Sequence, residues 1–391
     1  MASMTTPITR SVFAYVFVFI HVICVASAAV IEHNFTIGYF IASPDGIPVT
    51  VLGINNQIPS PSIVVNQGDT LVINVINNDP VHSHSLHWHG LTQKGSPEMD
   101  GVVGVTQCGL PPSQRMTYRL TINDDPGTYW YHDHSGLAKV GTRGIAGMLI
   151  VKPKEESHDP HYDLYVEEKE LFLQDWSHES PADSYMKSVG GLHPPVGQSA
   201  NAHNVAMSPW TSGLMNGKGI NGPSTTIGDV LKYAVIDLSS PFEKQKNAIN
   251  TDQLTTNHTS RMGTRLRIVN GGENFALKVS VDGHRLLIIS SDGTDTEPLA
   301  VDAVIVHVGE RYDAVLLPRD NGNIDENSQD TGNYWIRATT LETDEGAQVR
   351  IQTTRSDGLL ICCPYFGYEQ FPLLIVAAQI LSKLAFTFFL S

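Results

Sequence analysis

The sequence predicts an all-β protein with two consecutive β-sandwich or barrel domains. Short runs of β-branched and apolar residues recur along the chain, and clusters of Gly, Pro, Asn and Asp separate them. Helical periodicity is absent from these runs. A chain of 391 residues is long for one domain and suits two.

The first domain is expected at residues 29–153. Asn66-Gln67-Gly68-Asp69 and Asp124-Asp125-Pro126-Gly127 are typical turn sequences between its strands. The clearest predicted strands are Ser62–Val65, Thr70–Ile76, Met116–Ile122, Thr128–Tyr131 and Gly147–Val151. The charged segment 152–158 is expected to be a linker.

The second domain is expected at residues 160–354 and has the same pattern. Two long polar segments within it, 181–213 and 321–331, are predicted to be loops. Its predicted strands are Leu171–Asp175, Tyr233–Leu238, Arg265–Val269, Leu277–Val281, Leu286–Ile289, Ala303–Val308, Ala314–Leu317 and Tyr334–Ala338.

Residues 1–28 predict a secretory signal peptide. Arg10 precedes an apolar run at 11–25, and Ala26-Ser27-Ala28 fits cleavage between small residues. An uncleaved anchor is the alternative, and the small residues at the cleavage site disfavour it. The sequons at Asn34 and Asn257 agree with a secreted, extracellular glycoprotein. A net charge of -15 argues against nucleic acid and anionic membranes as partners.

The tail at residues 355–391 is strongly apolar. Its last run, 371–391, contains Lys383 as its one charged residue and reaches the ~20 residues needed to span a bilayer. Three interpretations are open: a membrane anchor, a lipid-anchor signal, or residues from an altered reading frame that replace a lost continuation. We favour the third, because Cys108, Cys362 and Cys363 leave an odd number of cysteines in the mature chain.

Two His-x-His pairs are the main functional signal. His87-Trp88-His89 and His132-Asp133-His134 lie in strand-like sequence, where side chains two apart share a face. A single pair is more often an ordinary surface or core feature. Two pairs predict a four-histidine site, and imidazole suits copper, zinc, iron or nickel. Six histidines scattered through the second domain lack ligand spacing and are expected to be surface or core residues: His178, His193, His203, His258, His284 and His307.

Together with their neighbouring motifs, these pairs resemble the multicopper oxidases, most closely the laccases and ascorbate oxidases. The resemblance is specific in the first domain and looser in the second. It implies cupredoxin-like Greek-key domains. It is carried by His87-Trp88-His89-Gly90, Met99-Asp100-Gly101, Gln107-Cys108, the segment 127–135, Arg143-Gly144 and 147–151, and more loosely by Asn216-Gly217, 265–270 and 334–338.

The resemblance implies a role for each site residue. His87 would bind the type 2 copper of a trinuclear centre, and His89, His132 and His134 would bind the paired type 3 coppers. Asp100 would assist proton delivery beside the type 2 copper, whereas without the family match it would be an ordinary turn residue. The implied activity couples oxidation of phenolic or similar donors to reduction of dioxygen to water.

The sequence departs from the family after the second domain. Members carry four more cluster histidines and the type 1 copper ligands in a third domain, within His-Pro-x-His-x-His and His-Cys-His motifs. Neither motif occurs here, and no histidine follows His307. We therefore expect a form truncated before the third domain, with a type 2 and type 3 half-site and no type 1 ligands.

Three functions follow from this departure. The chain is a laccase-like copper-dependent oxidase by family, which we expect to be inactive on its own, a non-catalytic secreted copper-binding isoform, or a half-site that needs a partner chain. In ascorbate-oxidase-like members the cysteine that matches Cys108 pairs with one in the third domain. Cys108 is therefore expected to lack that partner, and it would be available for a disulfide to another chain.

Overall fold

The computed structural model describes most of both predicted domains. The described residues are 28–135, 144–155, 159–179, 212–219, 221, 236, 263–273, 275–318 and 334–341, together with the backbone of 348–354 and 359–365. Two short 3-10 helices, η1 (Pro97–Met99) and η3 (Tyr162–Leu164), interrupt a structure that is otherwise strands, turns and loops within these ranges. The all-β prediction is confirmed.

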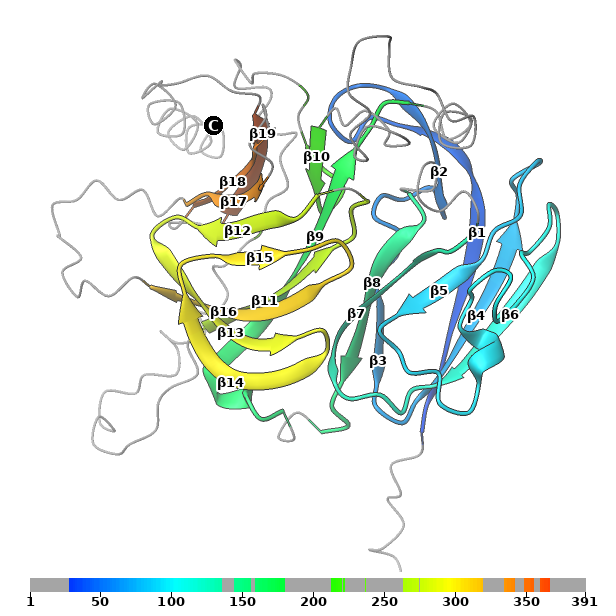
Figure 1. Cartoon of the computed structure of the whole chain (residues 1–391), viewed down its shortest axis with the longest axis horizontal. Helices are drawn as coiled ribbons and strands as arrows, with labels where there is room; N and C mark the ends of the chain where they lie inside the picture. Colours follow the sequence, from blue (N-terminus) through cyan, green and yellow to red (C-terminus); the bar gives the residue numbers. More distant parts are fainter. Residues whose placement is uncertain are drawn as a thin grey trace, which may run out of the picture.

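The first domain is a sandwich of two four-stranded sheets, ordered β2-β1-β4-β6 and β3-β8-β7-β5 (Figure 1). Parallel pairing of β1 with β4 and of β3 with β8 shows that the chain crosses between the sheets instead of forming a simple meander. The strands are β1 (Val30–Ala42), β2 (Val49–Ile54), β3 (Ile63–Asn66), β4 (Thr70–Asn77), β5 (Leu86–His89), β6 (Arg115–Thr121), β7 (Gly127–Asp133) and β8 (Ala146–Lys152).

The core of this sandwich contains aromatic residues from both sheets. Trp88 on β5 meets Tyr118 on β6 edge to face, with ring centroids 5.4 Å apart. Tyr131 on β7 stacks on Phe35 of β1 at 5.4 Å. All four side chains are fully buried, so β5 and β7 are held in place by the sheet opposite.

The second domain contains sheets of six and five strands, ordered β10-β9-β11-β16-β13-β14 and β15-β12-β17-β18-β19. Leu171, Leu266, Ile268, Val279 and Ala338 are central to its core. The strands are β9 (Tyr165–Trp176), β10 (Ser212–Met215), β11 (Gly263–Asn270), β12 (Leu277–Val281), β13 (His284–Ser291), β14 (Thr294–Val301), β15 (Val304–Val306), β16 (Arg311–Pro318), β17 (Ile336–Thr340), β18 (Gln348–Thr354) and β19 (Leu359–Tyr365).

The structure differs from the prediction near the end of the second domain. Strand β19 pairs with β18 beyond residue 354, where we expected the domain to end. The predicted strand Tyr233–Leu238 lies outside the described residues except for Ile236, which is buried but not in a strand. Residues 1–27 and 366–391 also lie outside them. No helix in the described ranges is long and apolar enough to cross a membrane.

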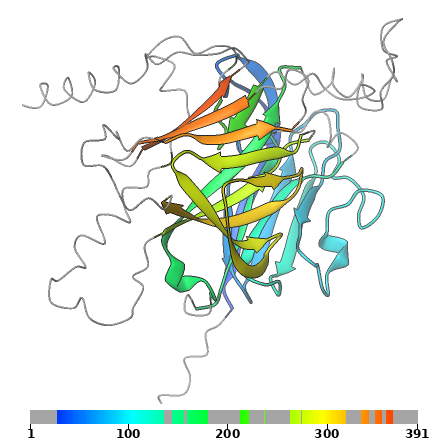
Figure 2. The same ribbon diagram turned by 60° about the vertical axis from the view of Figure 1, so that its left-hand side comes forward.

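The two domains meet along β7 (Figures 1 and 2). Trp130, Ala146 and Met148 of the first domain form one buried cluster with Phe172 and Val269 of the second. Strand β7 therefore belongs to both a domain core and the domain interface.

Buried charges reinforce this interface. The carboxylate of Asp313 on β16 accepts a hydrogen bond from Thr128 Oγ1 on β7 at 2.5 Å. Its other oxygen pairs with Arg265 and Arg267 of β11, at 2.5 and 3.1 Å. Arg311 Nε donates to the backbone oxygen of Thr128 at 3.1 Å. These contacts fix β7 against the second domain.

Candidate metal centre

Both predicted histidine pairs lie on neighbouring antiparallel strands. His87 on β5 is directly opposite His132 on β7, and His89 is opposite Trp130. The alternation of a strand directs Trp88 and Tyr131 into the core, where both are fully buried. His87, His89 and His132 face the other side and are half-buried.

Three of the four histidines converge closely enough to share a metal ion. One ring nitrogen each from His87, His89 and His132 lies within 4.8 Å of the others. His89 Nδ1 is 3.3 Å from His132 Nε2. His134 follows the end of β7 and is not in this set, but its ring centroid is 5.2 Å from that of His87 and 5.7 Å from that of His132. All four predicted ligands thus gather at one place.

Backbone carbonyl groups orient two of these rings. His87 Nδ1 is 2.8 Å from the carbonyl oxygen of Asp100, and His132 Nδ1 is 2.9 Å from that of Asp133. A carbonyl oxygen only accepts, so each Nδ1 carries a proton and donates it. In the neutral form of each ring, Nε2 then carries the lone pair that a metal ligand requires.

The electrostatic setting keeps the imidazoles of His89 and His132 neutral. Burial and, to a smaller extent, the nearby His132 and Arg311 lower the pKa of His89 to about 3. Burial also lowers the pKa of His132 to about 4. Neutral imidazole is the form that binds metals, and several converging imidazoles fit a copper ion. The residues present therefore suit the predicted cofactor.

Asp100 lies beside His87, where the resemblance implies it. Its Oδ1 is 3.2 Å from His87 Nδ1, and its side chain is 24% exposed. Trp88 Nε1 donates to the carbonyl oxygen of Met99 at 3.0 Å, which ties this turn to β5. Gly101 has a φ of +86°, and a Cβ there would lie 1.8 Å from the carbonyl oxygen of Leu86. Glycine is thus required for the turn to approach the strand.

Trp130 supports the site from the domain interface, which the sequence did not indicate. Its ring stacks on His89 at 5.0 Å and on His132 at 4.3 Å between centroids. Phe172 lies 6.2 Å from the same indole. A tryptophan lies within or close to each histidine pair in the sequence, but nothing in the local pattern separates the core role of Trp88 from the interface role of Trp130.

Asp133 faces away from the histidines that flank it, as strand alternation predicts. It is 1% exposed and is therefore a buried residue behind the site. Its carboxylate is hydrogen-bonded to His84, which sequence analysis missed. The available signal was a third His-x-His pair, His82-Ser83-His84, just before the first predicted ligand.

The other histidines occupy varied settings. His178 Nε2 is 2.6 Å from Asp45 Oδ2, His284 packs against Tyr334, and His307 is exposed. His193, His203 and His258 lie outside the described residues. Cys108 is exposed and has no disulfide partner among the described residues.

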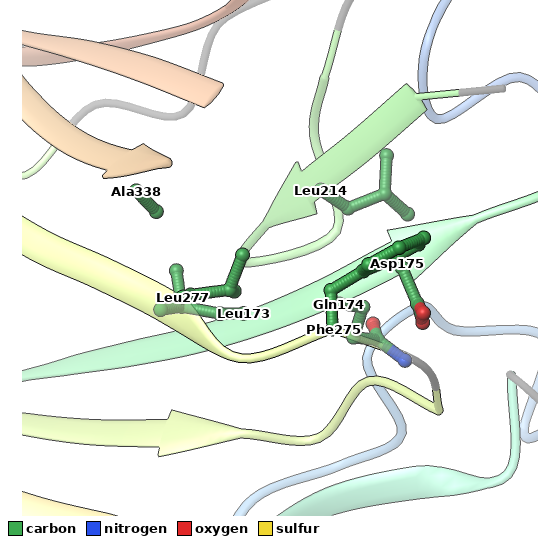
Figure 3. Close-up of a pocket in the computed structure, with 7 residues that line it drawn as sticks. All are labelled: Leu173, Gln174, Asp175, Leu214, Phe275, Leu277 and Ala338. Carbon is green, nitrogen blue, oxygen red and sulfur yellow. The ribbon is translucent and has the colours of Figure 1, made fainter. Parts of the chain in front are cut away.

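A small pocket in the second domain is separate from this site. It is lined by Leu173, Gln174, Asp175, Leu214, Phe275, Leu277 and Ala338 (Figure 3). Asp175 Oδ1 already accepts the backbone N–H of Glu273 at 2.8 Å. None of the predicted site residues lines this pocket, which is mainly a gap between apolar core side chains.

Comparison with known proteins gives the same picture. Laccase-2 of Thanatephorus cucumeris is 31% identical over 84% of this chain and 48% of its own length, and an L-ascorbate oxidase of Cucumis sativus is 30% identical over 78% and 47%. The chain thus spans about half the length of these relatives. The crystal structure of a laccase from Botrytis aclada, 25% identical, superposes with a TM-score of 0.56 over 80% of this chain and 49% of that one. Family models described as multicopper oxidase match residues 36–156 and 167–356. The chain belongs to the multicopper oxidase family.

Proposed function

We propose that this chain carries half of the copper cluster of a laccase-like enzyme. The convergence of His87, His89 and His132 within 4.8 Å, with His134 beside them, is the observation that supports this. By resemblance, His87 would hold the type 2 copper and the other three would hold the type 3 coppers. The second half of the cluster and the type 1 ligands have no counterpart in the printed sequence.

Bound copper supplies the redox chemistry, in which four electrons from phenolic or similar donors and four protons convert one dioxygen to two waters. The residues of this chain hold the site and move protons. Asp100 contacts His87 and is partly exposed, so its carboxylate can pass protons from solvent towards the site. Trp130 stacks on the imidazoles of His89 and His132 and so restricts how these rings can turn.

A non-catalytic copper-binding protein is the second candidate. It would hold copper with the four histidines but would need no type 1 site through which electrons enter. A half-site completed by another chain is the remaining alternative, and exposed Cys108 is where a disulfide to that chain would form. Non-reducing electrophoresis of wild type against Cys108→Ser tests the disulfide.

Copper titration of the purified full chain tests the proposal. We expect wild type to bind Cu(II) and the His87→Ala/His132→Ala double variant to lose at least about tenfold in affinity. Equal binding by both proteins would rule out the histidine site. A blue absorption band together with oxidation of a phenolic donor would establish autonomous catalysis and overturn the non-catalytic candidate.

We also propose that the chain enters the secretory pathway. Asn34 is exposed on β1, where an attached glycan would project into solvent. A glycosidase should increase the electrophoretic mobility of the protein secreted by eukaryotic cells, and Asn34→Gln should reduce that change. Retention of unglycosylated protein inside the cells would contradict secretion.

A further inference from the structure

A buried carboxylate joins the two strands that carry the candidate ligands. Asp133 Oδ1 accepts the backbone N–H groups of Ser85, just before β5, and Ser135, just after β7, at 3.1 and 3.0 Å. Its Oδ2 accepts from Ser135 Oγ at 2.8 Å and lies 2.9 Å from His84 Nδ1. One side chain therefore fixes the start of β5 relative to the end of β7.

His84 bridges this carboxylate to a second one. Its Nε2 is 2.9 Å from Asp79 Oδ2, and the side chains of His84 and both aspartates are fully buried. Ionised carboxylates only accept hydrogen bonds, so the ring donates from both nitrogens as an imidazolium between two negative charges. Burial works against that charged form, but the two carboxylates raise the pKa of His84 above its ordinary value.

Asp79 extends the network to the surface. It accepts the backbone N–H groups of Val81 and His82 at 2.8 and 3.1 Å. The His82 ring also reaches Asp79, at 3.1 Å, and is 27% exposed. His82 and His84 thus contact the same carboxylate, but only His84 continues to Asp133.

The backbone of Asp133 connects this network to the candidate metal centre. Its carbonyl oxygen accepts the Nδ1–H of His132 at 2.9 Å. The position of that carbonyl oxygen determines which nitrogen of His132 is protonated and how the ring is turned. The position of the Asp133 carbonyl group depends in turn on the Asp133 side chain, which its hydrogen bonds hold in place.

We propose that His84 is a positioning residue for the copper-binding imidazole of His132. It locks the Asp133 carboxylate between β5 and β7, and so fixes the carbonyl group that orients the His132 ring. The inference rests on the proposed function only in naming copper as the metal that this ring binds. The His84 ring is a buried imidazolium between Asp79 and Asp133. It acts on the His132 ring only through Asp133.

The protein without copper provides the first test. Nitrogen-15 NMR of the imidazoles should show one Nδ1-protonated form of His132 in wild type and in His82→Ala. In His84→Gln the two neutral forms should interconvert, while His87, which is held by Asp100, keeps its single form. A fixed His132 form in folded His84→Gln would overturn the inference. Because no copper is needed, this failure is distinct from failure of the proposed function.

Copper affinity provides the second test. At a temperature at which circular dichroism shows every variant folded, His84→Gln should bind Cu(II) about tenfold or more weakly than wild type, a loss typical of residues that support a metal ligand. His82→Ala should match wild type. Equal affinities for His84→Gln and His82→Ala would overturn the inference. If His84→Gln does not fold, the isosteric Asp133→Asn takes its place with the same expected results.

Discussion

The indole of Trp130 stacks on the imidazole of His132, with ring centroids 4.3 Å apart and 28° between the planes. The same indole belongs to the buried cluster that contains Phe172 and Val269 of the second domain. The candidate metal centre therefore lies on a surface that both domains build, although all four predicted ligands come from the first.

Truncation of this indole should weaken both the fold and the site. We expect Trp130→Ala to lower the free energy of unfolding by about 3–5 kcal/mol, the cost of removing a buried aromatic side chain. Trp130→Phe keeps much of the ring and should lose less. Urea denaturation measures the stability, and Cu(II) titration below the transition measures the site. A Trp130→Ala variant as stable as wild type would contradict the packing described.

Gly101, beside Asp100, can be compared with Gly104 to test how closely the turn approaches β5. Gly101 and Gly104 have similar φ values of +86° and +81°, but a Cβ at Gly101 would clash with β5 whereas one at Gly104 would meet nothing within 4 Å. Gly104→Ala should therefore cost only about 1 kcal/mol, from the left-handed backbone.

Gly101→Ala should cost clearly more and should separate Asp100 from His87. Thermal denaturation of the two variants measures the difference in stability. The orienting bond from His87 Nδ1 to the Asp100 carbonyl group can be followed by imidazole NMR. Equal destabilisation by the two substitutions would show that the turn does not press on β5.

The sequence predicted the candidate ligands better than it predicted the side chains that hold their strands in place. The grouping of His87, His89, His132 and His134 could be predicted because strand alternation is local and each motif is continuous. Arg311 contacts β7 from a segment about 180 residues away, and no local pattern encodes that contact. Strand β1 was also missed, since His33 interrupts the inward-facing apolar series of Ile31, Phe35 and Ile37.

The buried ion pairs of the second domain that lie at the domain interface should contribute more to stability than exposed pairs. Asp313 is 1% exposed and pairs with Arg265 and Arg267, so Asp313→Asn removes one of the two close carboxylate partners of each buried guanidinium group and leaves Asp159 for Arg265 and Glu168 for Arg267. We expect a loss of about 3–5 kcal/mol in the free energy of unfolding. Asp302 is 71% exposed and lies 3.7 Å from Arg285, so Asp302→Asn should change stability by less than about 1 kcal/mol.

Chemical denaturation followed by tryptophan fluorescence measures both variants. Because Asp313 also accepts from Thr128 on β7, we expect Asp313→Asn to separate the unfolding of the two domains into distinct transitions. A single transition with unchanged midpoint would show that the apolar cluster around Trp130 couples the domains without the charges.

Acid should weaken the network around His84 through Asp79. Burial raises the pKa of this carboxyl, but hydrogen bonds from His84 and from two backbone N–H groups outweigh burial and lower the pKa to about 2. A depressed folded-state pKa contributes stability that is fully present above the ordinary value of 3.8 and is lost as the pH falls towards 2.

The difference in stability between wild type and Asp79→Asn should therefore be largest near neutral pH and should shrink as the pH falls below about 4. Urea denaturation at a series of pH values measures it, with Asp302→Asn as the exposed control whose difference from wild type stays small throughout. Other buried carboxylates, including Asp159 and Asp313, also have lowered pKa values, so the acid sensitivity of wild type alone does not isolate Asp79. A wild-type-minus-Asp79→Asn difference that stays constant to pH ~2 would mean that Asp79 holds His84 without depending on its charge.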